Sequence, residues 1–252
     1  MTDVQGTLIV LHGPPKVGKT QLCDSFPGPV VFLATEAGHK FIRKDNKKRV
    51  ISLPPEQAGW ATLLKAISSG AIQKRKPKTI VVDTTQKLYD RCMDYVCAKN
   101  SVSHPSDGAH GKIWNAVSTE FMRGVEKLCA VADELGATLI FIDHTDTKEI
   151  KLQTSEFTRL DIALSTQPAR VVLPAADHIW FLGYEESADE VSADASGEAL
   201  GNNRWLWLQG NSSVNAGTRD PGIDAKVIKN LPKHNPYSYV AQKLNGSQLQ
   251  ED

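Results

Sequence analysis

The sequence predicts an α/β fold: a mostly parallel central sheet flanked by helices, followed by a C-terminal antiparallel extension. The first reason is a series of short apolar runs, which are typical of strands covered on both faces by helical crossovers. The second is a long amphipathic segment between the fourth and fifth runs. The third is size, because 252 residues, 40% hydrophobic and 23% charged, can bury a substantial core.

Five apolar runs in the first part of the chain are the expected strands. The run at 79–82 ends at Asp83, and the run at 138–142 comes directly before Asp143. Between them, apolar residues recur with helical spacing, which predicts a helix with one core-facing side; a groove for a partner helix is the alternative. The runs are 8–11, 30–34, 50–53, 79–82 and 138–142, and the stripe is Trp114, Val117, Phe121, Val125, Leu128, Ala132 and Leu135.

The chain changes character after residue 142. Residues 143–170 are polar and without a clear period, which predicts a mobile connection. Segments 176–182 and 205–208 are expected strands, separated by an acidic, flexible loop at 185–203. A partner-binding role of that acidic loop, or mimicry of a nucleic acid, is the alternative. The expected division of the chain is a single domain over 1–232 and a C-terminal tail over 233–252.

Charge and cysteine content exclude several classes of protein. The 29 Lys and Arg balance the 29 Asp and Glu, which argues against a coat of positive charge for gripping duplex DNA, although a local basic groove remains open. Four scattered cysteines fit reduced thiols better than a disulfide framework or a zinc site. No apolar run approaches the roughly 18 residues that span a bilayer, so we expect no membrane association and a cytoplasmic location.

The strongest motif is GPPKVGKT, from Gly13 to Thr20, which matches the phosphate-binding pattern of glycine, four residues, glycine, lysine and serine or threonine. The glycines permit a tight turn whose backbone amides point inward. Lys19 can reach the terminal phosphates of a nucleotide, and the Thr20 hydroxyl can ligate Mg²⁺. The residues that we assign to nucleotide binding are Gly13, Pro14, Pro15, Lys16, Val17, Gly18, Lys19, Thr20 and Gln21.

Polar residues at three strand ends are further candidates. Asp83 is expected to hold Mg²⁺ through water, with Thr84 assisting; a helix cap is the alternative. Glu36 follows the strand at 30–34, where a carboxylate can activate the attacking water, or is a cap or surface charge. His144 follows the strand at 138–142; it is either a sensor that signals a bound γ-phosphate to the next loop, or a packed or surface residue.

Together these segments resemble the RecA-like P-loop NTPase core with its Walker A motif, and more narrowly the short phage-encoded ATP-binding proteins of single-strand annealing and recombination. The resemblance covers residues 8–232. GPPKVGKT is similar to their phosphate loop, FLATEAGHK to the segment with their catalytic glutamate, TIVVDTTQKL to their magnesium-aspartate strand, and FIDHTDTKE to their γ-phosphate sensor. It implies that Glu36 activates water and His144 senses phosphate, although the sensor of RecA-type proteins is usually glutamine.

The resemblance also implies cofactors and partners: ATP and Mg²⁺, single-stranded DNA, self-association into a ring or filament, and a single-strand-binding protein. In such assemblies a cation reaches the phosphates of a neighbouring subunit, for which Arg219 and Lys226 are candidates; an exposed turn is the alternative for Arg219. DNA contacts are expected in 100–113 or 145–170. The cations at 74–78 are either a phosphate patch or a solvated loop. A phage-encoded protein would act in the host cytoplasm.

The leading interpretation is therefore a Mg²⁺-dependent, DNA-stimulated ATPase of homologous recombination or strand annealing. One rival is a P-loop small-molecule or nucleoside kinase, which usually needs clustered arginines over the acceptor. In this chain Arg123, Arg159, Arg170, Arg204 and Arg219 stand singly. The other rival is a nucleotide-gated scaffold protein, whose variant loop needs lysine directly after the first glycine, where this chain has Pro14.

Overall fold

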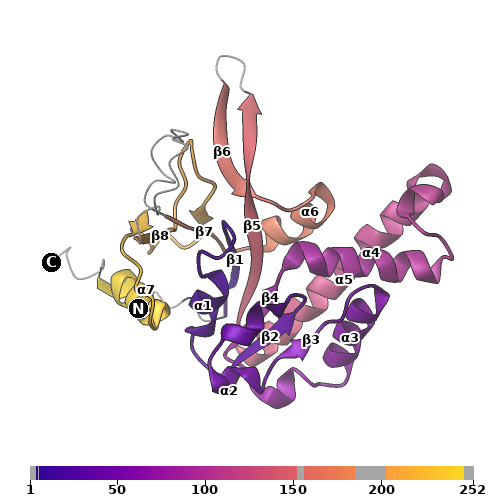
Figure 1. Ribbon diagram of the computed structural model, residues 1–252, viewed down its shortest axis with the longest axis horizontal. Coiled ribbons are helices and arrows are strands. Elements are labelled where there is room, and N and C mark those ends of the chain that lie inside the picture. The colour runs from indigo at the N-terminus through magenta and orange to yellow at the C-terminus, as the bar shows by residue number, and fades with distance from the viewer. Residues whose placement is uncertain (1–3, 5, 152–155, 185–202, 247–252) are drawn as a thin grey trace.

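The computed structural model describes residues 4, 6–151, 156–184 and 203–246, and this part contains one connected sheet. Its strands are β1 (Leu8–Gly13), β2 (Val30–Ala34), β3 (Ile51–Ser52), β4 (Thr79–Asp83), β5 (Thr138–Lys151), β6 (Glu156–Ile162), β7 (His178–Tyr184), β8 (Arg204–Trp207), β9 (Gly217–Thr218) and β10 (Val227–Ile228). They lie in the order β10-β8-β7-β1-β5-β4-β2-β3, with β6 beside β5 and β9 beside β7 (Figure 1).

The pairings from β7 through β1, β5, β4 and β2 to β3 are all parallel. β8 and β9 pair antiparallel with β7, and β10 pairs antiparallel with β8. The predicted fold class, a mostly parallel sheet with an antiparallel C-terminal extension, is therefore confirmed. β1 lies between β5 and β7, so the loop that follows β1 is near the middle of the sheet.

Helices cover both faces of this sheet (Figure 1). Along β2, Val31 and Leu33 pack into the core under α3 to α6, whereas Val30 and Phe32 pack into the core under α1 and α7. This alternation explains why the strands are apolar at every position. The helices are α1 (Lys19–Asp24), α2 (Lys44–Lys47), α3 (Gln57–Ser68), α4 (Thr85–Lys99), α5 (Lys112–Leu135), α6 (Thr166–Ala175) and α7 (Pro236–Gly246).

The predicted amphipathic helix is α5, and its central stripe is in the core: Val117, Phe121 and Leu128 are each at most 1% exposed. Trp114 departs from the prediction, since it is half-buried and contacts the edge of the His104 ring at a centroid distance of 5.6 Å. The partner-helix groove has no support here, because the stripe packs against the chain's own sheet and helices.

The expectation of a mobile connection over 143–170 is wrong. β5 continues beyond the sheet to Lys151 and pairs with β6 in a protruding antiparallel hairpin, from Thr145 opposite Ile162 to Lys151 opposite Glu156 (Figure 1). α6 follows the hairpin. Most residues of the outer part of this ribbon are exposed, so no alternation of apolar and polar residues marks it in the sequence.

The expectation of a tail after residue 232 is also wrong for residues 236–246, which form α7. Val240 and Leu244 are buried against the α1 side of the sheet, and the Tyr237 ring lies 4.1 Å from the Phe26 ring. Most of the acidic loop expected at 185–203, residues 185–202, lies outside the described residues, as do residues 247–252.

Two composition-based expectations can be compared with the described residues. The four cysteines are all free thiols, three buried and one half-buried, as expected. Among the helices of the described chain, none combines the length and apolarity needed to cross a bilayer.

Candidate nucleotide-binding site

The phosphate-binding motif forms the turn between β1 and α1, at the carboxyl end of the parallel strands. Close approach of backbone requires a glycine at position 13, and a left-handed backbone conformation favours one at position 18. A Cβ on Gly13 would collide with the Leu182 carbonyl, and a Cβ on Gly18, whose φ is 104°, would collide with the Arg204 guanidinium. Arg204, on β8, donates to the Val17 carbonyl (3.3 Å) and the Pro232 carbonyl (2.6 Å), so β8 supports the loop from behind.

Lys19 folds back over its own loop. Its Nζ donates to the carbonyls of Gly13 (2.7 Å) and Pro14 (2.9 Å). Burial lowers the pKa of this ammonium to about 8, and the carboxylates of Asp83 and Asp143 oppose the shift. The ammonium is thus held beside the loop by neutral carbonyls and by the field of two acids, and a phosphate would offer it a stronger partner.

Asp83 and Thr20 meet directly: Thr20 Oγ1 donates to Asp83 Oδ2 at 2.9 Å. Burial raises the pKa of Asp83, the Thr20 hydrogen bond opposes this, and the nearby Glu36 carboxylate adds to it. A divalent cation would offset both the desolvation and this repulsion. No group of three or more His, Cys, Asp or Glu in the described part could hold a metal. Mg²⁺ usually takes one or two carboxylates and completes its shell with phosphates and water.

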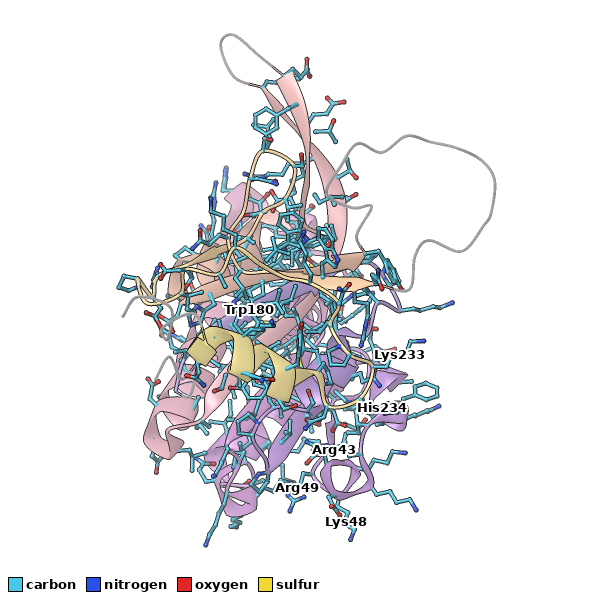
Figure 2. The ribbon with its side chains drawn as sticks, turned by 90° about the vertical axis from the view of Figure 1, so that its left-hand side faces the viewer. Arg43, Lys48, Arg49, Trp180, Lys233 and His234 are labelled. Carbon is cyan, nitrogen blue, oxygen red and sulfur yellow. The ribbon has the colours of Figure 1, made fainter. Side chains whose placement is uncertain are left out.

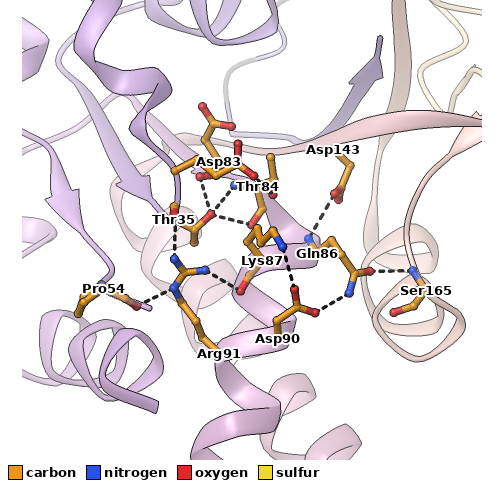
Figure 3. A network of polar contacts seen from close by, with 11 residues as sticks. Thr35, Pro54, Asp83, Thr84, Gln86, Lys87, Asp90, Arg91, Asp143 and Ser165 are labelled. Atoms are coloured by element: carbon orange, nitrogen blue, oxygen red, sulfur yellow. Dashed lines mark hydrogen bonds and ion pairs between the residues drawn. The ribbon is translucent and has the colours of Figure 1, made fainter. Parts of the chain in front are cut away.

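A buried polar network joins the strand ends that carry Glu36 and Asp83 (Figure 3). Thr35 Oγ1 donates to the Asp83 carbonyl (2.7 Å) and accepts from the Thr84 amide (2.7 Å). Arg91, on α4 and 8% exposed, donates to the carbonyls of Thr35 (2.6 Å) and Pro54 (2.7 Å). These bonds clamp the ends of β2 and β4 onto α4, which fixes the backbone on which both acidic side chains stand.

One cavity of about 560 Å³ brings these segments together. The Glu36 carboxylate is half-buried there, and Thr84 Oγ1 donates to Glu36 Oε1 at 3.5 Å. Of the nine residues assigned to nucleotide binding, Gly13, Pro14 and Val17 are not in the wall, because their backbone shapes the loop behind it. The cavity is lined by Pro15, Lys16, Gly18, Lys19, Thr20, Gln21, Glu36, Gly38, Phe41, Ile42, Asp83, Thr84 and His144.

β5 carries two further polar residues near the site: His144, which lines the cavity, and Asp143, which is buried and does not line it. Asp143 and His144 lie opposite His12 and Gly13 in the β1–β5 register. Asp143 Oδ1 accepts from the Gln86 amide (3.2 Å) at the start of α4, and burial raises the pKa of this carboxyl to about 7. Burial and the Lys19 charge lower the pKa of His144, which favours a neutral ring near pH 7. Within the described residues His144 Nδ1 is buried without a hydrogen-bond partner.

His12, the residue before the loop, connects the site to the base of the hairpin. Its Nε2 lies 2.7 Å from the Asn215 carbonyl and its Nδ1 2.9 Å from Thr145 Oγ1. Because a carbonyl only accepts, Nε2 carries the proton and Nδ1 accepts from Thr145. Burial lowers the pKa of His12 to about 4. Asn215 Nδ2 donates in turn to Asp161 Oδ1 (2.6 Å) on β6.

This buried histidine predicts a specific loss of stability in acid. The pKa of His12 is 6.5 in the unfolded chain and about 4 in the folded protein. Between these pH values the unfolded chain therefore binds a proton that the folded protein does not. The contribution is intact above pH 6.5 and is lost as pH falls, by about 3 kcal/mol in total. Urea unfolding across this range should show a smaller loss for His12→Gln than for the parent and for the exposed-site control His110→Gln. Equal losses in all three would contradict a buried, neutral His12.

The candidate cations from a neighbouring subunit are not at this chain's own cavity. The Arg219 amide donates to the Asp177 carbonyl (2.9 Å), and Asp177 Oδ2 accepts from the amide of Leu8 (2.8 Å), where β1 begins. Arg219 is therefore at the opposite end of β1 from the phosphate loop, and a catalytic role would require a second subunit. Lys226 is an exposed residue just before β10.

Several residues of the site could not be chosen from the sequence. Arg91 and Arg204 act on the loops through backbone carbonyls that are 56 and 187 residues away in the chain. Phe41, which is 91% exposed at the cavity rim, belongs to no recognisable sequence motif. The position of Asp143 after an apolar strand was a usable signal, because such positions face the same sheet edge as Asp83.

The parallel sheet, the loop after its middle strand and the facing Thr20–Asp83 pair define a P-loop nucleotide-binding protein. A family model described as an AAA domain matches residues 5–219, most of the chain, and the chain belongs to this family. Membership indicates a nucleotide-binding P-loop ATPase. No curated protein matches the sequence. The predicted P-loop class is thus confirmed, while the closer resemblance to phage recombination proteins stays a prediction.

Proposed function

We propose that this protein is a Mg²⁺-dependent ATPase that assembles on single-stranded DNA and supports phage-type recombination or strand annealing. The observation that carries the ATPase part is that the phosphate loop, Glu36, Asp83 and His144 line one and the same cavity. These residues come from four neighbouring parallel strands or the loops after them, and their meeting in one place is what hydrolysis of a bound triphosphate requires.

In this proposal Lys19 leaves the Gly13 and Pro14 carbonyls and donates to the terminal phosphates of ATP. Thr20 and Asp83 are the residues that would hold Mg²⁺. When bound, the cation neutralises charge on the phosphate oxygens and orients them. Asp143, behind Lys19, adds negative charge that favours the protonated ammonium, which counters the lowering of its pKa by burial.

Glu36 orients the attacking water and accepts its proton. The water oxygen bonds to the γ-phosphorus, the bond from that phosphorus to the β–γ bridging oxygen breaks, and ADP leaves. Thr84, 3.5 Å from Glu36 Oε1, helps to hold the carboxylate toward the water. His144 contacts the γ-phosphate as a neutral ring, and its strand continues into the hairpin, so loss of the phosphate can alter the hairpin.

Single-stranded DNA is the proposed partner, and binding of ATP would favour an assembled, DNA-competent state that hydrolysis releases. Self-association into a ring or filament would give Arg219 or Lys226 a route to the phosphates of a neighbouring subunit. A single-strand-binding protein is a further proposed partner. These parts rest on the family resemblance and on the connection between β5 and the hairpin.

The test is steady-state ADP production with and without single-stranded DNA, with particle size followed by light scattering. We expect DNA to raise turnover several-fold and to increase particle size with ATP, and chelation of Mg²⁺ to abolish turnover. Turnover that ignores DNA but depends on a nucleoside or another small acceptor would replace the ATPase proposal with a kinase. Turnover that ignores both would remove the DNA partner and leave the ATPase.

A further inference from the structure

The hairpin, which includes most of one segment expected to contact DNA, has few cations to offer. Asp161 accepts from Arg159 (3.0 Å) and pairs with Lys148 (3.5 Å). Lys151 pairs with Glu156 at 3.1 Å. All three hairpin cations therefore face carboxylates, and these carboxylates would repel the phosphates of a bound strand.

The other expected contact segment, 100–113, is largely occupied with its own structure. His104 Nδ1 accepts from the Ser106 amide (3.2 Å), the His104 ring packs on Trp114, and Asp107 Oδ2 accepts from the Ser103 and His104 amides. His104 and Trp114 thus stabilise a turn before α5. We therefore expect DNA to contact a surface outside these two segments.

Unpaired cations concentrate in two segments far apart in the sequence. Residues 40–49 (KFIRKDNKKR) hold six Lys and Arg against one carboxylate, and residues 74–78 (KRKPK) hold four against none. Ion pairs in the described chain involve only Arg43 among these ten, with Asp24 at 3.4 Å. A chain with zero net charge therefore carries a third of its 29 cations here. We name the following residues the amino-edge basic surface: Arg43, Lys44, Lys47, Lys48, Arg49, Lys74, Lys76 and Lys78.

The fold brings the two segments together at the amino ends of neighbouring strands. Asn46 Oδ1 on α2 accepts from the Val30 amide (3.3 Å), where β2 begins. The Lys78 amide donates to the Pro29 carbonyl (2.9 Å), one residue earlier. Residues 43–49 precede β3 and residues 74–78 precede β4, and these strands flank β2. The two segments are thus separated by about two strand spacings, roughly 10 Å.

The positive surface extends toward α7. Lys233 and His234 line a depression of about 280 Å³ together with Arg43, and Figure 2 shows them on the same side of the molecule as Lys48 and Arg49. On the other side it is bounded by the acidic last turn of α5, which carries Asp133 and Glu134 and leads to β5 beside Lys78.

We infer that the amino-edge basic surface binds the phosphate backbone of single-stranded DNA. This inference rests on the proposed DNA partner and names its contact site. When exposed lysines without carboxylate partners neutralise phosphates, the counterions condensed on the nucleic acid are released, and this release is a large source of affinity. Phe41, 91% exposed at the start of the same run, offers a ring to an unpaired base but not to a base inside a duplex. Because Phe41 also lines the nucleotide cavity, a bound strand would lie next to that cavity.

The test compares two triple variants that each remove three positive charges. The first is Lys44→Ala, Lys47→Ala, Lys48→Ala on the basic surface, and its matched control is Lys148→Ala, Lys151→Ala, Arg159→Ala on the hairpin. Anisotropy of a labelled oligonucleotide with Mg²⁺ and ATP is measured across a salt series. The surface variant should bind tenfold to hundredfold more weakly at about 0.1 M salt, with a salt slope about two units shallower. The control should change less than about threefold.

Several outcomes would overturn the inference. If the hairpin variant loses binding and the surface variant does not, the site is the hairpin and the DNA partner stands. If the parent chain binds no single strand, the partner itself is wrong, and tighter binding of duplex or of anionic vesicles would show which other phosphate surface is used.

Two controls accompany the test. Replacement of the same three lysines by arginine should restore binding, and unchanged melting temperatures and DNA-independent turnover would exclude unfolding as the cause.

Discussion

Replacement of Lys19 by alanine is expected to abolish measurable ATP turnover and to weaken nucleotide binding strongly. The buried ammonium is the one cation in the wall of the cavity that lies beside both Asp83 and Asp143, judging from the described residues. Loss of a pre-positioned donor to the transferring phosphoryl group costs on the order of 10²–10³-fold in turnover. The measurement is ADP release at saturating Mg²⁺ and ATP, with nucleotide affinity determined in parallel.

The matched control is Lys127→Ala, which removes an exposed lysine of α5 at a distance from the cavity. It should keep the turnover and affinity of the parent protein. Parent-like turnover in Lys19→Ala would remove the phosphate loop from the mechanism. If Lys19→Ala is inactive but has also lost its cooperative thermal transition, Lys19→Arg tests the role of the charge in a folded chain, and full activity there would show that a lysine is not needed.

The second large effect is expected at Glu36. Glu36→Gln keeps the size and the hydrogen bond from Thr84 but removes the group that accepts a proton from water. Turnover should fall by about 10²–10⁴-fold, the range for loss of a positioned general base, while ATP remains bound. A single-turnover experiment with radiolabelled ATP separates the two steps.

The control for this prediction is Glu126→Gln, an exposed carboxylate of α5. It removes the same charge far from the cavity and should leave both steps unchanged. If Glu36→Gln binds ATP weakly but hydrolyses the bound ATP at the rate of the parent protein, Glu36 supports the structure of the site and does not activate water.

The parallel part of the sheet could be predicted because each strand is buried on both faces and is therefore apolar throughout, as in 30–34 and 79–82. The hairpin could not, since the outer part of β5 has polar residues on both sides. α7 was missed for a different reason. It has few apolar residues, such as Val240 and Leu244, and their role becomes visible only when they pack into the same core cluster as Phe26.

The site was predictable where local geometry determines it. The phosphate loop, Asp83, Glu36 and His144 all come shortly after apolar runs that form parallel strands, and the carboxyl ends of such runs meet at one edge of the sheet. The supporting arginines and the basic surface depend on strand order, which no local pattern contains. The cations at 74–78 lie beside those at 43–49 only because β2 separates β3 from β4.

The most direct test of nucleotide binding by the phosphate loop is a calorimetric titration of the purified protein with ADP and with a non-hydrolysable ATP analogue, each with Mg²⁺ and with chelator. We expect one nucleotide bound per chain, with binding of the triphosphate weakened when Mg²⁺ is removed and strongly weakened in Lys19→Ala. Absence of binding by either nucleotide, in a protein that melts cooperatively, would contradict this expectation.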